Sequence, residues 1–163
     1  MTKRLTQMAL LTALALIIFT VEAQLPPLAP IPGFKLGLAN IITVYAMFRL
    51  GPRDTLLILL GRIFLGAVFA GAFSSLLFSL SGGILCYLAM LGLRRVLTER
   101  QLWVCGILGA LCHNLGQMGA AVLVYNTAAV LVYLPPLLLA GMVTGAFTGL
   151  SAQLLLRRLG GRQ

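Results

Sequence analysis

The sequence predicts an all-α membrane protein, a bundle of about six transmembrane helices that forms a single polytopic domain over residues 1–163. Apolar residues make up 60% of the chain and charged residues only 9%, whereas a soluble domain has about 45–50% and about 25%. The apolar residues form long runs. A spanning helix needs about 20 of them, so the chain holds at most about six such helices. This composition excludes a soluble globular enzyme and a disordered protein.

The first half of the chain contains three expected helices, at residues 5–21, 34–48 and 54–71. A proline-rich loop at residues 22–33 separates the first two, because proline lacks a backbone N–H and cannot continue a regular helix. Residues 49–53 separate the second from the third. There Gly51 suits the end of one helix, and Pro52 suits the first position of the next.

The second half contains three more expected helices, at residues 81–93, 102–124 and 136–156. An apolar stretch with serines, residues 72–80, is expected to connect the third helix to the fourth. The basic turn at residues 94–100 separates the fourth from the fifth, because charged side chains avoid the hydrocarbon region. Residues 125–127 begin the last connection, and Pro135 and Pro136 favour the start of a helix.

The basic residues predict the orientation of the chain in the lipid bilayer. With the N-terminus in the cytoplasm, ten of the 12 Lys and Arg residues fall on the cytoplasmic side: Lys3, Arg4, Arg49, Arg53, Arg94, Arg95, Arg100, Arg157, Arg158 and Arg162. Lys35 lies toward the outside and Arg62 lies within a segment, so this distribution follows the positive-inside rule. We therefore expect a multi-pass protein of the cell membrane with both termini cytoplasmic. The same rule explains the net charge of +9 without a nucleic-acid partner.

The first apolar run also fits a second interpretation. Lys3 and Arg4 precede the run, and the small residues around Val21 to Ala23 resemble the cleavage site of a signal peptide. The run is long for a signal peptide, and the rest of the chain has the same polytopic character. We therefore expect a retained transmembrane helix.

The chain offers little for catalysis. Its carboxylates and cysteines are Glu22, Asp54, Glu99, Cys86, Cys105 and Cys112. Asp54 and Glu99 are expected to pair in solvent with their neighbours Arg53 and Arg100. The cysteines lie in apolar runs without a C-x-x-C motif, and no phosphate-binding P-loop is present. We therefore expect a protein that is not an enzyme, needs no metal or cofactor, and binds a ligand instead.

Arg62 is the most informative residue in the membrane segments. It lies eight positions into the third expected helix, about 12 Å deep at about 1.5 Å per residue. An arginine at such depth costs at least about 2.5–3.5 kcal/mol on insertion scales. Its side chain either extends back to the cytoplasmic surface or faces a polar cavity and meets an anion. Gly66 and Ala70 share its helix face and would allow another helix to approach closely.

A second polar group lies in the fifth expected helix. His113, Asn114 and Gln117 fall within one turn of each other, about 16 Å into the segment. Such side chains either hold helices together by hydrogen bonds, at about 0.6–2 kcal/mol per bond, or bind a ligand. The two roles are compatible, and both stay open here.

A third polar group lies near the start of the second expected helix, where Lys35 directly follows the proline loop and Asn40 comes five residues later. Lys35 is close enough to the outer interface to extend into water. If Lys35, Arg62 and His113 share a cavity, that cavity is electropositive. It would then suit a small anionic or strongly hydrogen-bonding ligand.

Taken in order, these features resemble the substrate-binding S components of energy-coupling-factor (ECF) vitamin transporters. The matching features are the small pair Ala9 and Ala13, the loop Pro30-Ile-Pro-Gly-Phe-Lys-Leu-Gly37, and the Gly51-Pro52 pair between two helices. The chain is most similar to the Gx transporter family, which is also labelled heptaprenyl diphosphate synthase component I. The resemblance covers nearly the whole chain and is most specific from Pro30 to Arg95.

This resemblance implies a six-helix bundle that binds its substrate near the outer face. It also implies a transmembrane coupling subunit that docks on Ala9 and Ala13, and ATPase subunits that supply the energy. The synthase label implies a different role. Prenyl diphosphate synthases hold Mg²⁺ on two aspartate-rich motifs, and this chain has a single aspartate. Under that label the chain would be a non-catalytic membrane partner.

The sequence therefore supports three hypotheses about function. The first is a membrane subunit of an ECF-type importer that captures a small, anionic or polar, vitamin-like ligand. The second is a non-catalytic membrane partner of an isoprenoid or prenyl diphosphate synthase. The third is a purely structural membrane subunit. The expected ligand-binding residues are Lys35, Asn40, Arg62, His113, Asn114 and Gln117, and the expected partner-binding residues are Ala9 and Ala13.

Overall fold

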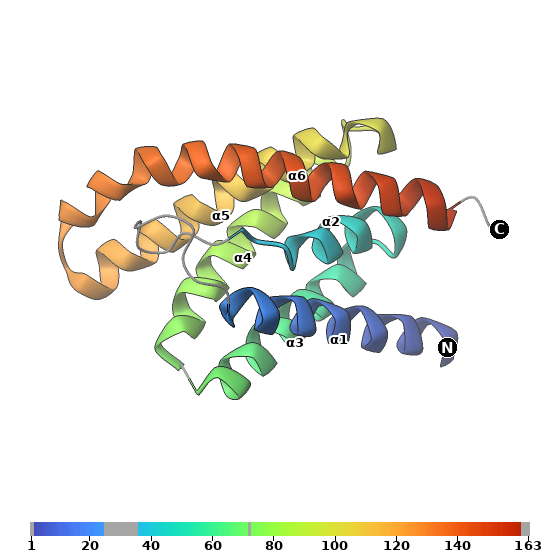
Figure 1. Cartoon of the computed structure of the whole chain (residues 1–163), viewed down its shortest axis with the longest axis horizontal. Coiled ribbons are helices and arrows are strands. Elements are labelled where there is room, and N and C mark those ends of the chain that lie inside the picture. Colours follow the sequence, from blue (N-terminus) through green and yellow to red (C-terminus); the bar gives the residue numbers. More distant parts are fainter. Residues whose placement is uncertain (1, 25–35, 72, 161–163) are drawn as a thin grey trace.

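The computed structural model describes residues 2–24, 36–71 and 73–160, and this part of the chain is built from helices and their connections. The α-helices are α1 (Thr2–Gln24), α2 (Asn40–Arg49), α3 (Pro52–Ala70), α4 (Phe73–Leu93), α5 (Leu102–Tyr125) and α6 (Leu134–Gly160). Two short 3₁₀ helices, η1 (Glu99–Gln101) and η2 (Ala128–Tyr133), lie between them. The start of α1 and the end of α6 lie at the same end of the bundle (Figure 1). The all-α prediction is confirmed.

Four of the described helices, α1, α4, α5 and α6, are long and apolar enough to cross a membrane. Helix α2 has 10 residues and is about 15 Å long, half the thickness of a hydrocarbon core of about 30 Å. Helix α3 has 19 residues but carries Arg53, Asp54 and Arg62. The chain thus has the character of a membrane protein, and the expected count of about six spanning helices is not confirmed.

The second helix begins later than predicted. Residues 36–39 form a turn, so the helix expected at residues 34–48 starts at Asn40; residues 34 and 35 lie outside the described part. Two features explain this late start. Gly37 has φ +67°, which glycine adopts without strain. The carboxylate of Glu22 also accepts hydrogen bonds from the backbone N–H groups of Gly37 and Leu38, at 2.6 and 2.9 Å. A distant side chain therefore satisfies donors that a longer helix would have used.

The fourth helix begins earlier than predicted. The serine-containing stretch at residues 72–80 was expected to connect two helices, but α4 runs from Phe73. The break lies instead at Gly71, which has φ +61° and ends α3 in the left-handed conformation. The hydroxyl of Ser81 donates to the carbonyl of Phe78 at 3.1 Å, and such bonds let serine remain inside a helix.

Helix α5 packs closely on both α4 and α6, and α5 and α6 run side by side (Figure 1). Glycines make this approach possible. A Cβ placed on Gly145 of α6 would lie 2.7 Å from the carbonyl oxygen of Gly106 and 2.8 Å from the Cα of Ile107. A Cβ on Gly116 of α5 would lie 2.6 Å from the carbonyl oxygen of Ser81. Any larger residue would push the helices apart.

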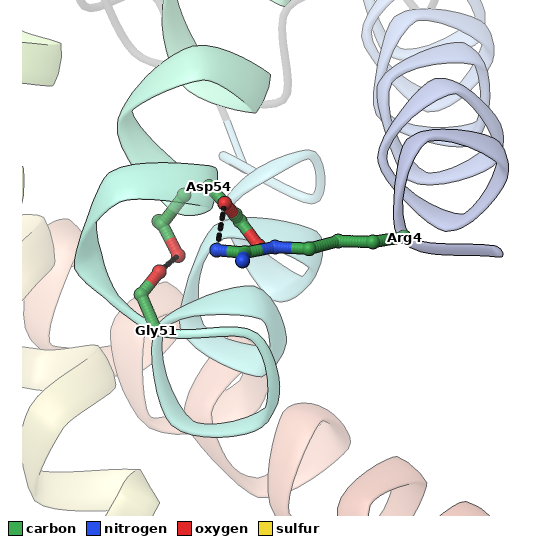
Figure 2. Close-up of polar contacts among 4 residues, drawn as sticks. Arg4, Gly51 and Asp54 are labelled. Carbon is green, nitrogen blue, oxygen red and sulfur yellow. Dashed lines mark hydrogen bonds and ion pairs between the residues drawn. The ribbon is translucent and has the colours of Figure 1, made fainter. Parts of the chain in front are cut away.

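Helix α1 lies against α3 at the edge of the bundle and is tied there by an ion pair. The guanidinium of Arg4 donates from Nε and Nη2 to the two carboxylate oxygens of Asp54, at 2.6 and 2.7 Å. Figure 2 shows Arg4 reaching from α1 to the start of α3. The prediction that Asp54 pairs in solvent with Arg53 is therefore wrong. Its side chain is only 6% exposed and its partner lies 50 residues away.

Candidate functional site

Five of the six predicted ligand-binding residues line one cavity of about 60 Å³. They are Asn40, Arg62, His113, Asn114 and Gln117. The sixth, Lys35, lies outside the described residues, as does most of the proline loop. The five come from α2, α3 and α5, which are separated along the sequence. The fold therefore brings together polar side chains that the sequence presents as three independent groups.

Arg62 is buried within the bundle rather than extended to a surface. Its exposed fraction is 8%, and its Nε is buried without a hydrogen-bond partner within the described part of the chain. Helix α1 covers this part of α3, because a Cβ on Gly66 would lie 3.0 Å from the ring of Phe19. The side chain of Arg62 therefore lines a polar cavity. It does not extend back to the cytoplasmic surface.

Glu22 lines the same cavity as Arg62. The sequence alone did not indicate that this carboxylate lies near Arg62. No ion pair joins Glu22 to Arg62, both of which belong to the described part of the chain. The Glu22 carboxylate instead binds the backbone N–H groups of Gly37 and Leu38. Glu22 thus holds the segment before α2 at the cavity wall, and its charge attracts the guanidinium of Arg62 without forming an ion pair.

Asn114 also holds two helices together. Its Nδ2 donates to the carbonyl oxygen of Leu137 on α6 at 2.8 Å. A Cβ on Gly141 would lie 2.5 Å from that nitrogen, so a glycine is needed at this crossing. The amide has further hydrogen-bonding atoms, and the residue lines the cavity as well. A structural role and a binding role are therefore compatible in Asn114.

Glycine also positions His113 and Gln117 beside α4. A Cβ on Gly82 would lie 2.8 Å from the Cγ of Gln117, 2.8 Å from the backbone oxygen of His113 and 3.0 Å from its ring. This close approach brings the polar turn of α5 against α4.

Sequence reasoning missed two threonines that line the cavity from α6, Thr144 and Thr148. Each hydroxyl donates to a carbonyl of its own helix, from Thr144 to Gly141 at 3.4 Å and from Thr148 to Gly145 at 3.1 Å. Their spacing of four residues places them on one helix face, and this spacing in an apolar segment is the signal that could have found them.

A second, larger cavity of about 480 Å³ adjoins the first and was not predicted. Its lining is mostly apolar: Ser75, Phe78, Ser79, Gln117, Met118, Ala121, Tyr125, Val130, Tyr133 and Leu137. Phe78 and Tyr125 stack there, with ring centroids 6.2 Å apart. Ser79 and Gln117 line both cavities.

The predicted partner-binding residues lie on a free face of α1. Ala9 and Ala13 are exposed, whereas Ala15 on the inner face is 1% exposed. Helix α1 packs on α3 through its other side. The fold thus leaves the small residues uncovered within this chain, and their role in docking stays a prediction.

The described residues contain no group of three His, Cys, Asp or Glu side chains that could hold a metal ion. Among known proteins, the family model described as heptaprenyl diphosphate synthase component I matches residues 11–155. Comparisons with curated proteins and with solved structures gave no match. The matched region extends from the first half of α1 to the last turns of α6.

Proposed function

The chain belongs to the heptaprenyl diphosphate synthase component I family, as its sequence features predicted, and from this membership and the polar cavity we propose a function in ligand capture. The protein is a non-catalytic membrane subunit that binds a small anionic or polar group for an ECF-type importer. The observation that carries this proposal is the buried Arg62 facing a cavity lined by hydrogen-bonding side chains.

A buried arginine favours an anionic ligand on energetic grounds. Placing the guanidinium at membrane depth costs at least about 2.5–3.5 kcal/mol, and Glu22 does not pair with it directly. The guanidinium presents a planar set of donors that suits a carboxylate or phosphate. His113 and Gln117 lie close enough to line the same cavity and add donors or acceptors. Glu22 attracts the guanidinium only from a distance, so a bound anion in direct contact would offset the part of this cost that remains.

Transport by such a subunit requires energy from other chains. The sequence has no P-loop, so in this proposal ATPase subunits act in trans through a transmembrane coupling subunit. The exposed face at Ala9 and Ala13 is suited to that contact, because small residues let a partner helix approach closely.

The family description favours a second candidate, a non-catalytic partner of a prenyl diphosphate synthase. The single aspartate, Asp54, is paired with Arg4, so the described residues hold no aspartate pair for Mg²⁺. This candidate predicts stable co-purification with a soluble prenyl transferase. The capture proposal instead predicts a small ligand retained by the membrane chain alone.

The test of ligand capture is native mass spectrometry of the chain purified gently from its native membrane. Wild-type protein should carry a small anionic adduct, and Arg62→Gln should weaken its retention about tenfold or more. The reason is that hydrogen bonds to charged groups contribute about 1.5–3 kcal/mol, and about 1.4 kcal/mol is tenfold in affinity. The matched control is Arg53→Gln, which removes an exposed charge from the same helix. Equal adduct on Arg62→Gln, together with a lowered Tm, would assign Arg62 a structural role and contradict the proposal.

A further inference from the structure

We propose that the ligand is an amphiphile, with its anionic head group against Arg62 in the polar cavity and its hydrocarbon tail in the apolar cavity between α4, α5, η2 and α6. This inference rests on the function proposed above and names the chemical class of the ligand. It is carried by the sizes, linings and shared wall of the two cavities.

The sizes of the cavities separate the head from the tail. Ligand pockets usually measure about 300–1,000 Å³. At about 60 Å³, the polar cavity holds a few waters, since one water needs about 10–15 Å³. It is large enough for a head group such as a carboxylate or phosphate and too small for a whole vitamin-like molecule. The apolar cavity, at about 480 Å³, falls within the usual range.

The cavities meet along a shared wall. Ser79 of α4 and Gln117 of α5 line both of them. On the polar side, Gln117 is joined by His113 and Asn114, and on the apolar side Ala121 follows it one helical turn later. A single ligand that extends past Gln117 can therefore place a polar head group in one cavity and an apolar tail in the other.

The lining of the larger cavity suits a hydrocarbon tail. It combines aliphatic side chains with the stacked rings of Phe78 and Tyr125, and none of its residues carries a formal charge. Tyr125 and Tyr133 are 62% and 40% exposed, so the cavity reaches the surface of the bundle. A tail moving from the bilayer into this cavity stays in an apolar environment. Selection of the ligand then depends on its head group, since lipid is as apolar as the cavity wall.

The test compares three probes that separate head from tail: dodecyl phosphate, dodecanol and inorganic phosphate. Binding to the purified full chain in a mild detergent is measured by native mass spectrometry across a concentration series. Dodecyl phosphate should bind about tenfold or more tightly than either of the other two, because only it fills both cavities. Equal binding of dodecanol and dodecyl phosphate would mean that the cavity is a general lipid site, and would overturn the proposal.

Variants locate each part of the probe. Arg62→Gln should weaken dodecyl phosphate about tenfold and leave dodecanol unchanged. Ala121→Trp should fill the apolar cavity and weaken dodecyl phosphate by a similar factor, whereas inorganic phosphate binding stays the same. The matched control is Leu123→Trp, which adds the same ring to α5 at a position that is 82% exposed and should change neither. If Ala121→Trp lowers Tm strongly, Val130→Trp on η2 blocks the same cavity from another element.

The outcomes distinguish this inference from the proposed function. If Arg62→Gln weakens dodecyl phosphate while both blocking variants leave it unchanged, capture of an anion at Arg62 stands and the amphiphile assignment fails. If binding of the phosphate probes is independent of Arg62, both fail.

Discussion

At the scale of single residues, a charge in this chain is explained by its three-dimensional neighbours rather than by its sequence neighbours. Asp54 follows Arg53 in sequence but binds Arg4 through both carboxylate oxygens. Arg62 and Glu22 lie 40 residues apart in the sequence and line the same cavity. An arginine side chain is long enough to reach a residue on a neighbouring helix. Its partner therefore depends on which helices pack together.

The Arg4–Asp54 pair should stabilise the docking of α1 on α3. We expect Asp54→Asn to lower Tm, because the substitution removes one charge from a two-point hydrogen bond to a side chain that is only 6% exposed. Arg4→Gln should lower Tm similarly. Combining the two substitutions should cause no further loss of stability, because the two residues act as one unit. Thermal melts of the four proteins measure this. Glu99→Gln, at an exposed carboxylate, serves as the control, and strictly additive losses would contradict the pairing.

At the scale of elements, α1 illustrates how a helix with few buried residues can still take a defined position in the bundle. Of its residues, only Ala15 is fully buried, and Met8, Leu11 and Ile18 pack beside it. The opposite face presents Ala9 and Ala13 to the surroundings. The helix therefore has one face fixed by α3 and one face free for lipid or for a partner.

Replacing both Ala9 and Ala13 with leucine tests whether the free face docks a coupling subunit. The two added side chains would keep another helix at a distance while leaving the face on α3 untouched. Pull-down with candidate coupling subunits should show lost association, with Tm and ligand retention unchanged. Leu5→Ala and Leu10→Ala, at exposed positions of the same helix, should not affect association. Undiminished association of the double leucine variant would leave Ala9 and Ala13 as ordinary lipid-facing residues.

At the scale of the whole molecule, contacts gather the expected cytoplasmic segments at one end of the bundle. The Arg4 pair joins the start of α1 to the start of α3. The hydroxyl of Tyr87 in the second half of α4 donates to the carbonyl of Pro52 at 3.2 Å. A Cβ on Gly51 would lie 3.8 Å from Nη1 of Arg94. These contacts agree with the distribution of basic residues, even though α2 is too short to span a bilayer alone.

Labelling of single cysteines tests this orientation, with the native cysteines replaced. Cysteines at Arg53 and Thr98 should react with an impermeant reagent only from the cytoplasmic side, and a cysteine at Ala128 only from the outside, because the positive-inside rule places the basic turns in the cytoplasm. All three positions are exposed. Reaction at Thr98 from the outside would contradict the proposed topology.

The sequence by itself determined the helical membrane class and the family, and it raised capture of an anionic or polar ligand as a hypothesis. Composition and hydrophobic run length are local properties, and they are independent of how helices pack. The tertiary structure alone decided that Arg62, Asn40 and the polar turn of α5 share a cavity, that Asp54 binds Arg4, and that α2 begins at Asn40. It also revealed the apolar cavity beside Gln117. The shared cavity depends on close approach between helices at glycines such as Gly82, and the contacts of Arg4 and Glu22 join segments far apart in sequence. A linear pattern does not specify which of these segments meet.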